Sequence, residues 1–246
     1  MNERVENILD EVRRAGDIAV PELALRTGAS EVTVRRALIS LEEQGLVVRT
    51  RGRAQAPGPV FLDQVAVMSE EKRRIGLAAA ELIGAGEVVA FGPGTTTTAT
   101  ACSIAPDLPV RVITNAVNIA MELYRRPQAR VFLTGGELRS GWFSLVGQAA
   151  AEAMRDTLPD KAIIGVTGID LAQGLTDDHR EEAAITRLMM MQARQRIVVA
   201  DSSKFGQTGH TRVWPLEKTD IIVTDSGITR RQAAGYEAKG VRIIRV

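Results

Sequence analysis

The first 54 residues carry apolar positions at helical spacing and predict three short helices. The first is indicated by four apolar residues spaced i, i+3, i+4 and i+7, namely Val5, Ile8, Leu9 and Val12. A second helix is expected to begin at Pro21, a residue suited to the first helical position, and to end at a tight turn at Gly28. Ser30 is placed to cap a third helix, whose buried stripe is predicted to be Val34, Leu38 and Leu41.

A short hairpin is expected to follow the third helix. Residues 46–49 read as a strand, and Gly52 stands where the tip of a hairpin would lie. Three helices followed by a basic hairpin are typical of an α+β winged helix-turn-helix, so residues 1–54 are predicted to form such a domain. Two prolines around a glycine, at positions 57–59, favour an extended linker over residues 55–69.

From residue 70 onward, short β-rich runs alternate with helical stretches. Strands are predicted over residues 88–91, 110–114, 131–134, 162–166, 197–200, 221–224 and 241–244. This alternation is typical of an α/β domain with a largely parallel sheet, which residues 70–246 are expected to form.

The composition, with 45% hydrophobic and 25% charged residues, is that of an ordinary globular protein. The single cysteine, Cys102, excludes an intrachain disulfide and fits a reducing cytosol. No apolar run approaches the ~18 residues that cross a bilayer. Met1 to Arg4 lack the start of a secretory signal, so a cytoplasmic protein without a membrane partner is expected. His179 and His210 have no metal-ligand spacing with the cysteine, so neither a metal nor another cofactor is expected.

Charge is distributed unevenly, although the net charge is only +1. Residues 26–53 hold six arginines against three glutamates, which predicts a local basic surface. The outward face of the third helix suits a DNA major groove, and the wing arginines suit phosphates or a minor groove. The residues expected to bind DNA are Ser30, Val32, Thr33, Arg35, Arg36, Arg49, Arg51 and Arg53. The alternative interpretation is a solvated helical bundle whose arginines only keep it soluble.

Small polar residues follow the predicted strands of the second domain. Ligands of open α/β sheets collect at the carboxyl ends of the strands, and residues 94–97 offer backbone amides and hydroxyls at a helix start. This run predicts an anion site of phosphate size, with an ordinary threonine-rich helix cap as the alternative. Lys204, in another such loop, either joins this site or is simply solvated.

Motifs along nearly the whole chain resemble those of DeoR-type bacterial transcriptional regulators. Residues 30–38 with 41–46 are similar to the recognition helix of that family, and residues 200–206 form a distinctive match in the second domain. The resemblance implies that the second domain shares the fold of ribose-phosphate isomerases and binds a phosphorylated sugar. By the same resemblance, the phosphate would be held by Gly94, Thr95, Thr96, Thr97 and Lys204, and the sugar would lie near Asn115, Gly136, Glu182 and Asp201.

Some positions depart from the family pattern. Ala37 stands where aspartate is usual, and residues 51–54 replace a His-Gly-Gly-Ala wing with Arg-Gly-Arg-Ala. Gly92 and Thr167 replace acidic residues of many members, which removes two acceptors for sugar hydroxyls. These changes bear on which operator and which effector the protein recognises.

The combined pattern predicts a sequence-specific transcriptional regulator, a repressor by the habit of the family, which a phosphorylated sugar or related metabolite releases from a double-stranded operator. Presenting paired recognition helices calls for a homo-oligomer, expected to be a dimer or tetramer. The alternative is a sugar-phosphate isomerase with an accessory DNA-binding domain. Isomerases of this fold use a lysine and acidic residues in the region of residues 163–187, which here contains no lysine, so no catalytic residue is assigned.

Overall fold

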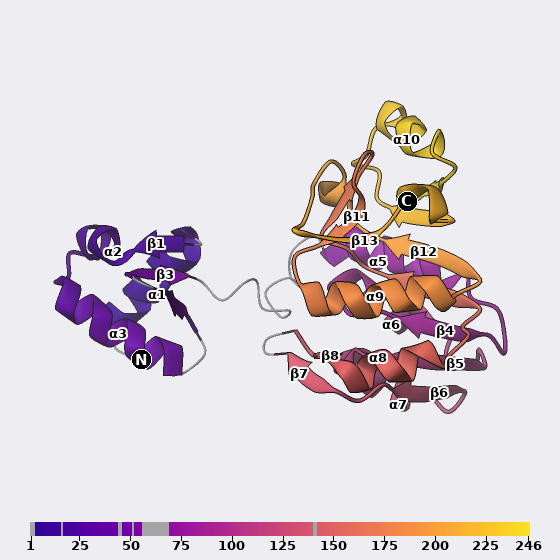
Figure 1. The fold of residues 1–246 in the computed structure, drawn as a ribbon, viewed down its shortest axis with the longest axis horizontal. Helices are drawn as coiled ribbons and strands as arrows, with labels where there is room; N and C mark the ends of the chain where they lie inside the picture. The colour runs from indigo at the N-terminus through magenta and orange to yellow at the C-terminus, as the bar shows by residue number, and fades with distance from the viewer. Residues whose placement is uncertain (1–2, 16, 44–45, 51, 56–68, 140–141) are drawn as a thin grey trace. The chain divides into compact units, whose positions relative to one another are not determined.

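The computed structural model describes residues 3–15, 17–43, 46–50, 52–55, 69–139 and 142–246 (Figure 1). The chain divides into two compact units, Met1–Gln64 and Val65–Val246, and each is described by itself. The expected wing residue Arg51 and residues 56–68 of the expected linker lie outside the described residues.

In its described residues, the N-terminal unit combines three helices with a three-stranded antiparallel sheet. The elements in chain order are α1 (Glu3–Ala15), β1 (Asp17–Ala19), α2 (Val20–Thr27), α3 (Glu31–Glu43), β2 (Val48–Thr50) and β3 (Arg53–Gln55). Strand β3 lies between β1 and β2 and pairs antiparallel with each, so the hairpin after α3 forms a wing. This arrangement confirms the predicted winged helix-turn-helix.

One apolar cluster joins all three helices and the wing of this unit. Val34, Leu38 and Leu41 are buried in it, as the helical spacing predicted. Ala37 is buried in the same cluster, where an unpaired polar side chain would be costly, so its apolar character suits its surroundings. The opposite face of α3 is left for solvent or a partner.

The C-terminal unit is built around a seven-stranded parallel sheet. Its strands in chain order are β4 (Val88–Phe91), β5 (Val110–Thr114), β6 (Ala129–Leu133), β9 (Lys161–Ile164), β12 (Gln195–Val199), β14 (Ile221–Thr224) and β15 (Arg242–Arg245). Their order across the sheet is β15-β14-β12-β9-β4-β5-β6, and every neighbouring pair is parallel. Each strand corresponds to one of the runs predicted from the sequence, which confirms the α/β class.

Helices cover both faces of this sheet (Figure 1). One face packs against α5 (Ser69–Ala80), α6 (Thr95–Ser103) and α7 (Val117–Tyr124). The other packs against α8 (Gln148–Arg155), α9 (Arg180–Gln192) and α10 (Arg230–Glu237). Strand β4 shows how side chains alternate between the two faces. Val89 and Phe91 belong to the apolar cluster on the side of α5, α6 and α7, while Ala90 belongs to the cluster on the side of α8, α9 and α10.

Two small antiparallel sheets accompany the main sheet and were not anticipated by the hydrophobic pattern. One is the hairpin of β7 (Glu137–Arg139) and β8 (Ser144–Val146), and the other consists of β10 (Gly168–Asp170), β11 (Gly174–Asp177) and β13 (Thr211–Trp214). Two 3-10 turns, η1 (Ser202–Lys204) and η2 (Leu216–Lys218), follow β12 and β13. These strands have three or four residues each, too few for a clear alternation of polar and apolar positions.

Helices α5 and α6 come into close contact at Gly76. A Cβ atom at this position would lie 2.7 Å from the carbonyl carbon of Ala99 and 2.9 Å from the backbone nitrogen of Thr100. Backbone atoms cannot move aside as a flexible side chain can, so only glycine allows this separation between the two helices.

We expect Gly76→Ala to destabilise the protein by about 1–3 kcal/mol, because overpacking outweighs the gain in helix propensity. Gly235→Ala in α10 is the matched control, since a Cβ there would meet Leu171 at an ordinary 3.6 Å. Urea unfolding of both variants measures the difference. A control as damaging as Gly76→Ala would contradict a special constraint at the contact between α5 and α6.

Candidate DNA-binding surface and effector site

Ser30 directly precedes the recognition helix α3 and caps it, as predicted. Its Oγ accepts a hydrogen bond from the Thr33 backbone N–H at 3.2 Å and lies 2.9 Å from Thr33 Oγ1. Gly28, with φ of 64°, closes α2 in the left-handed conformation that glycine adopts readily. The tight turn and the cap together fix where α3 starts relative to α2.

The outward face of α3 carries the side chains predicted to meet DNA. Val32 is 71% exposed, and Arg35 and Arg36 are exposed as well. Arg35 donates to Glu31, one turn earlier, at 2.8 Å. Such an exposed pair contributes little stability, so a stronger anionic partner can replace Glu31. The face therefore offers one apolar group and two cations to a ligand.

The described wing arginines lie beside α3. The Arg49 Nε atom donates to Glu42 Oε2 at 2.7 Å, and its backbone N–H donates to Glu42 Oε1 at 3.1 Å. These hydrogen bonds lower the pKa of the Glu42 carboxyl group. Arg53 is exposed on β3. A shallow hollow brings residues of α3 and the wing together, lined by Val20, Arg35, Leu38, Arg49, Gly52 and Arg53.

In the C-terminal unit, the strand order reverses direction between β4 and β9. From β4 the chain proceeds through β5 to β6 on one side, and then returns to β9 and the strands on the other side. In open α/β sheets, ligands bind at the carboxyl ends of the strands at such a switch point. The Gly94–Thr97 loop follows β4 at this place, and a Cβ atom added at Gly165, which follows β9, would lie 3.8 Å from the Thr97 methyl carbon.

The start of α6 supplies free backbone amides at this edge of the sheet. The first hydrogen bond of the helix runs from the Thr98 N–H to the Gly94 carbonyl at 3.0 Å, so the N–H groups of residues 95–97 have no acceptor within the helix. The hydroxyl of Thr97 donates to the same carbonyl at 2.8 Å. The Thr97 side chain is buried, whereas that of Thr95 is partly exposed. Backbone amides, more than the hydroxyls, are therefore the groups available to an anion.

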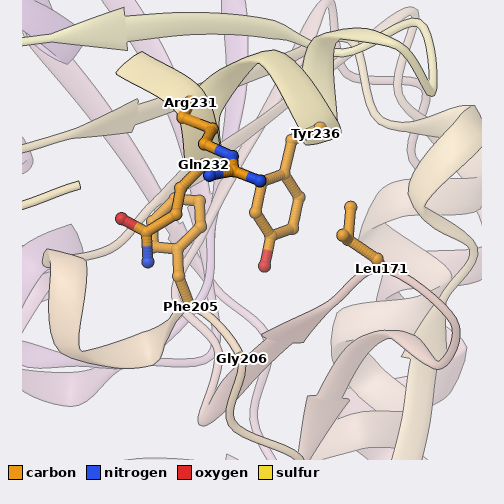
Figure 2. A pocket seen from close by; sticks show the side chains of 7 residues that line it. Leu171, Phe205, Gly206, Arg231, Gln232 and Tyr236 are labelled. Atoms are coloured by element: carbon orange, nitrogen blue, oxygen red, sulfur yellow. The ribbon is translucent and has the colours of Figure 1, made fainter. Parts of the chain in front are cut away.

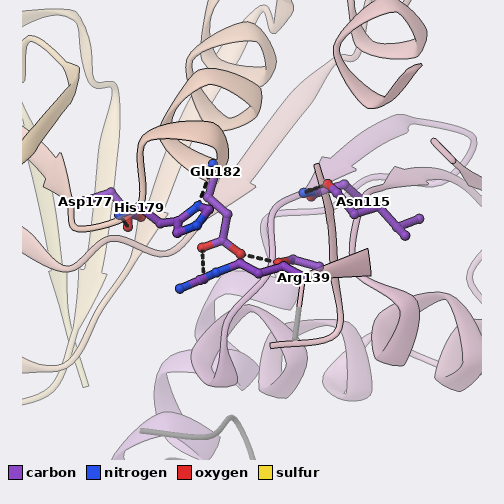
Figure 3. A network of polar contacts seen from close by, with 7 residues as sticks. Asn115, Arg139, Asp177, His179 and Glu182 are labelled. Atoms are coloured by element: carbon purple, nitrogen blue, oxygen red, sulfur yellow. Dashed lines mark hydrogen bonds and ion pairs between the residues drawn. The ribbon is translucent and has the colours of Figure 1, made fainter. Parts of the chain in front are cut away.

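Glu182 lies at the centre of a polar network formed with the hairpin β7–β8 (Figure 3). The Arg139 guanidinium donates to one carboxylate oxygen at 2.8 Å, and the Ser144 hydroxyl donates to the other. The Glu182 backbone N–H donates to the Nδ1 atom of His179, which caps α9, at 3.4 Å. In this state both carboxylate oxygens of Glu182 are already hydrogen-bonded, so a sugar hydroxyl would have to compete for them.

Asn115 and Gly136 lie in the loops after β5 and β6. The Asn115 Nδ2 atom donates to the Leu145 carbonyl at 2.9 Å, while its buried Oδ1 atom has no hydrogen-bond partner in the structure. Gly136 has φ of 115°, and a Cβ there would lie 2.4 Å from the Val146 carbonyl oxygen. Close packing against β8 thus explains this glycine. The proximity of either residue to a sugar remains a prediction.

Asp201 and Lys204 lie on the loop that follows β12. The buried Asp201 carboxylate accepts hydrogen bonds from the backbone N–H and the hydroxyl of Ser203, which holds the turn η1 in shape. Behind this loop the Phe205 ring stands edge-on to Tyr236, with 5.0 Å between ring centroids. A mostly apolar pocket lies beside them (Figure 2), lined by Leu171, Phe205, Gly206, Arg231, Gln232, Gly235 and Tyr236.

Lys72 is a charged residue near this loop that the sequence reasoning missed. It lies on α5 and is only 7% exposed. Burial lowers the pKa of its ammonium group; Asp201 opposes this shift and Lys204 adds to it. A signal was present in the sequence, because Lys72 is one helical turn before Ile75 and Gly76, on the stripe that packs inward.

A winged helix-turn-helix unit joined to an α/β unit with free backbone amides at the start of α6 has the organisation of a DNA-binding regulator with a sensor domain. Two family models match the chain, the DeoR-like helix-turn-helix domain over residues 4–59 and the DeoR C terminal sensor domain over residues 67–226. The chain belongs to the DeoR family of transcriptional regulators.

Named relatives agree with this assignment. The chain is 35% identical to the HTH-type transcriptional repressor GlcR of Bacillus subtilis, over 91% of this chain and 88% of the relative. It is 31% identical to the glycerol-3-phosphate regulon repressor of Escherichia coli K12, over 91% and 90% of the two chains. A solved ribose 5-phosphate isomerase A from Methanocaldococcus jannaschii aligns with 56% of this chain and 54% of its own, with a TM-score of 0.42 and 15% identity.

In the described part of the chain, no helix combines the length and apolar character needed to span a membrane. The same residues contain no group of three or more histidine, cysteine, aspartate or glutamate side chains arranged to hold a metal ion.

Asp177, at the end of β11, is a carboxyl group whose surroundings favour its protonated form. Burial and the nearby Glu182 raise its pKa to about 6, although the His179 backbone N–H donates to it at 3.1 Å. Because the folded protein then binds this proton more tightly than the unfolded chain, the contribution of Asp177 to stability falls as pH rises from about 4 to about 6.

We therefore expect Asp177→Asn to match the wild type in stability near pH 4 and to exceed it by roughly 1–3 kcal/mol at pH 7 and above. Urea unfolding from pH 4 to 8 measures this difference, and the exposed Asp107→Asn variant is the control. A wild-type advantage at pH 7 would show that the carboxylate is instead stabilised by folding.

Proposed function

We propose that the protein is a repressor that binds a double-stranded DNA operator through α3 and the wing, acts as a homo-oligomer, and leaves the operator when a phosphorylated small molecule binds its C-terminal unit. The observation that carries the effector half is the set of free amides at the start of α6, at the strand switch point. The repressors among its relatives support the DNA-binding half.

On the DNA side, the groups of α3 have different roles. Arg36 and Val32 are proposed to read base edges in the major groove, where a guanidinium pairs with guanine and an apolar group contacts a thymine methyl. Arg49 and Arg53 are proposed to bind backbone phosphates, as is Arg51 from the wing. Ser30 and Thr33 complete the start of the helix, where an N-terminal turn favours a phosphate. Arg35, beside the wing hollow, is proposed to assist these phosphate contacts.

On the effector side, the phosphate is proposed to lie on residues 94–97 and Lys204. Asn115, with its unpaired Oδ1 atom, and Gly136, Glu182 and Asp201 are proposed to line the sugar end. The relative named for a glycerol-3-phosphate regulon is consistent with a phosphorylated effector of this kind. Release from DNA then follows if the effector binds more tightly to an arrangement of the oligomer that does not fit the operator.

The DNA-reading role of α3 predicts that Arg36→Ala weakens operator binding by about 1–3 kcal/mol and relaxes the base preference at one position. An operator selected by the full chain from random DNA provides the test sequence, and fluorescence anisotropy measures the affinity. Arg230→Ala, an exposed arginine of α10, is the control for lost net charge. Unchanged affinity of the Arg36→Ala protein for the selected operator would overturn the assignment of this face.

The phosphate role of the α6 start predicts opposite results for two nearly isosteric variants. Thr95→Asp should remove the response to phosphorylated ligands, because a carboxylate beside the free amides repels the phosphate, while Thr95→Asn should keep most of it. Both should remain folded, since an acidic residue in the first turn of a helix is favourable.

A panel of sugar phosphates and their unphosphorylated parents, followed by thermal unfolding, measures the response. A ligand at 100 times its dissociation constant adds about 2.7 kcal/mol of stability. Stabilisation by the unphosphorylated parents alone, or an undiminished response in Thr95→Asp, would count against the phosphate site.

A further inference from the structure

Strand β6 leaves one edge of the seven-stranded sheet open. Within the described residues, β5 is its only neighbour in the sheet. The Thr134 N–H donates to the Thr114 carbonyl at the end of β5. Because the backbone groups of successive residues point to opposite sides of a strand, Val131 and Leu133 direct their N–H and carbonyl groups to the open side.

Helix α7 packs along β6 and adds an exposed aromatic side chain to this edge (Figure 1). Asn118 faces α6, because its Nδ2 atom donates to Thr98 Oγ1 at 2.8 Å. Ile119 and Leu123 are buried in the apolar cluster beneath the helix. The helical period therefore turns Tyr124 away from α6 and toward the open edge, where its side chain is 83% exposed.

The two edges of the sheet differ in character. Phe132 points to the face of β6 opposite Val131 and is 57% exposed. At the other edge, the exposed residues of β15 are Arg242 and Arg245, charges of the kind that keep an edge strand from pairing. Large apolar side chains beside an open strand edge mark a surface that another chain covers. The β6 edge is therefore the one suited to association.

The charges around β6 suit a second copy of the same chain, placed antiparallel. Arg125 and Arg130 are exposed near the amino end of the strand, and Glu137 is exposed just beyond its carboxyl end. When two β6 strands run antiparallel about a two-fold axis, the cations of each copy lie toward Glu137 of the other. A parallel arrangement would instead bring like charges together. The surface is thus complementary to itself.

We propose that the β6–α7 edge, formed by strand β6 with Tyr124 and Phe132, is the surface through which two copies of the chain associate, with their β6 strands antiparallel. This inference rests on the proposed function, since a repressor that binds paired half-sites needs at least two copies. A two-fold axis perpendicular to the sheet keeps the α7 helices of both copies on the same face, so they pack side by side and cover Tyr124.

Analytical ultracentrifugation of the full-length chain measures the association. Tyr124→Glu and Phe132→Glu should each raise the dissociation constant of the pair about a hundredfold or more, because each puts a carboxylate in place of an aromatic anchor in both copies. Met191→Glu is the matched control and should associate as the wild type does, since Met191 on α9 is 56% exposed. All three variants should unfold cooperatively on heating, because the substituted side chains are exposed.

Two single charge reversals test the antiparallel arrangement. Arg130→Glu and Glu137→Arg should each associate about tenfold or more weakly than the wild type, because each places like charges opposite one another. An equimolar mixture of the two variants should recover the wild-type association, since every contact between the unlike copies then joins opposite charges. A contact within one chain predicts no such recovery.

Unchanged association in either aromatic variant would mean that another occupant, such as the winged unit of the same chain, covers the edge. That result would overturn the inference and leave the proposed function standing. So would failure of both aromatic variants to fold, or a mixture of the charge-reversed variants that associates no better than either alone. If the wild-type chain is monomeric both free and on its operator, the inference falls together with the proposed homo-oligomer.

Discussion

The parallel pairing of β4 with both β5 and β9 is the constraint on which the C-terminal unit depends. Because the chain leaves β4 in one direction and later returns to its other side, the loops after β4 and β9 diverge to opposite faces of the sheet. The strands from β15 to β5 place apolar residues on both faces, whereas the edge strand β6 packs apolar residues on one face only, so most of the carboxyl edge is a rigid platform for polar loops. The free amides of α6, the turn η1 and the cap of α9 all belong to these loops.

Fold prediction succeeded where a single physical pattern decides the structure. The strands 88–91, 110–114 and 221–224 appear with the predicted bounds, because strands buried on both faces read as short apolar runs. In α3, the helical period separates Val34 and Leu38 from the exposed Val32 without ambiguity. The strands that escaped prediction, such as β1 and β7, have three residues each, and tertiary pairing rather than local sequence makes them strands.

In the candidate site, too, residues with a local sequence signal were predictable, whereas contacts that only the fold creates were not. The Gly94–Thr97 loop was predictable because glycine and threonine at a strand-to-helix junction are typical of a helix start that offers backbone amides and hydroxyls. Glu182 was named from a resemblance, yet its partners Arg139 and Ser144 lie about forty residues away in the chain, and only the fold brings them together. Lys72 lies in the charged run from Glu70 to Arg74, which resembles a solvated surface segment. The charge of this run hid the helical spacing, which places Lys72 on the buried face of the helix.

The contact at Gly76 couples the movement of α5 to that of α6. Since α5 and α6 meet backbone to backbone there, neither helix can shift without carrying the other, and close-packed elements move as units rather than deform. A ligand that moved the start of α6 would therefore act on α5 as a whole. The size of that effect cannot exceed the difference in the ligand's binding free energy between two arrangements of these helices.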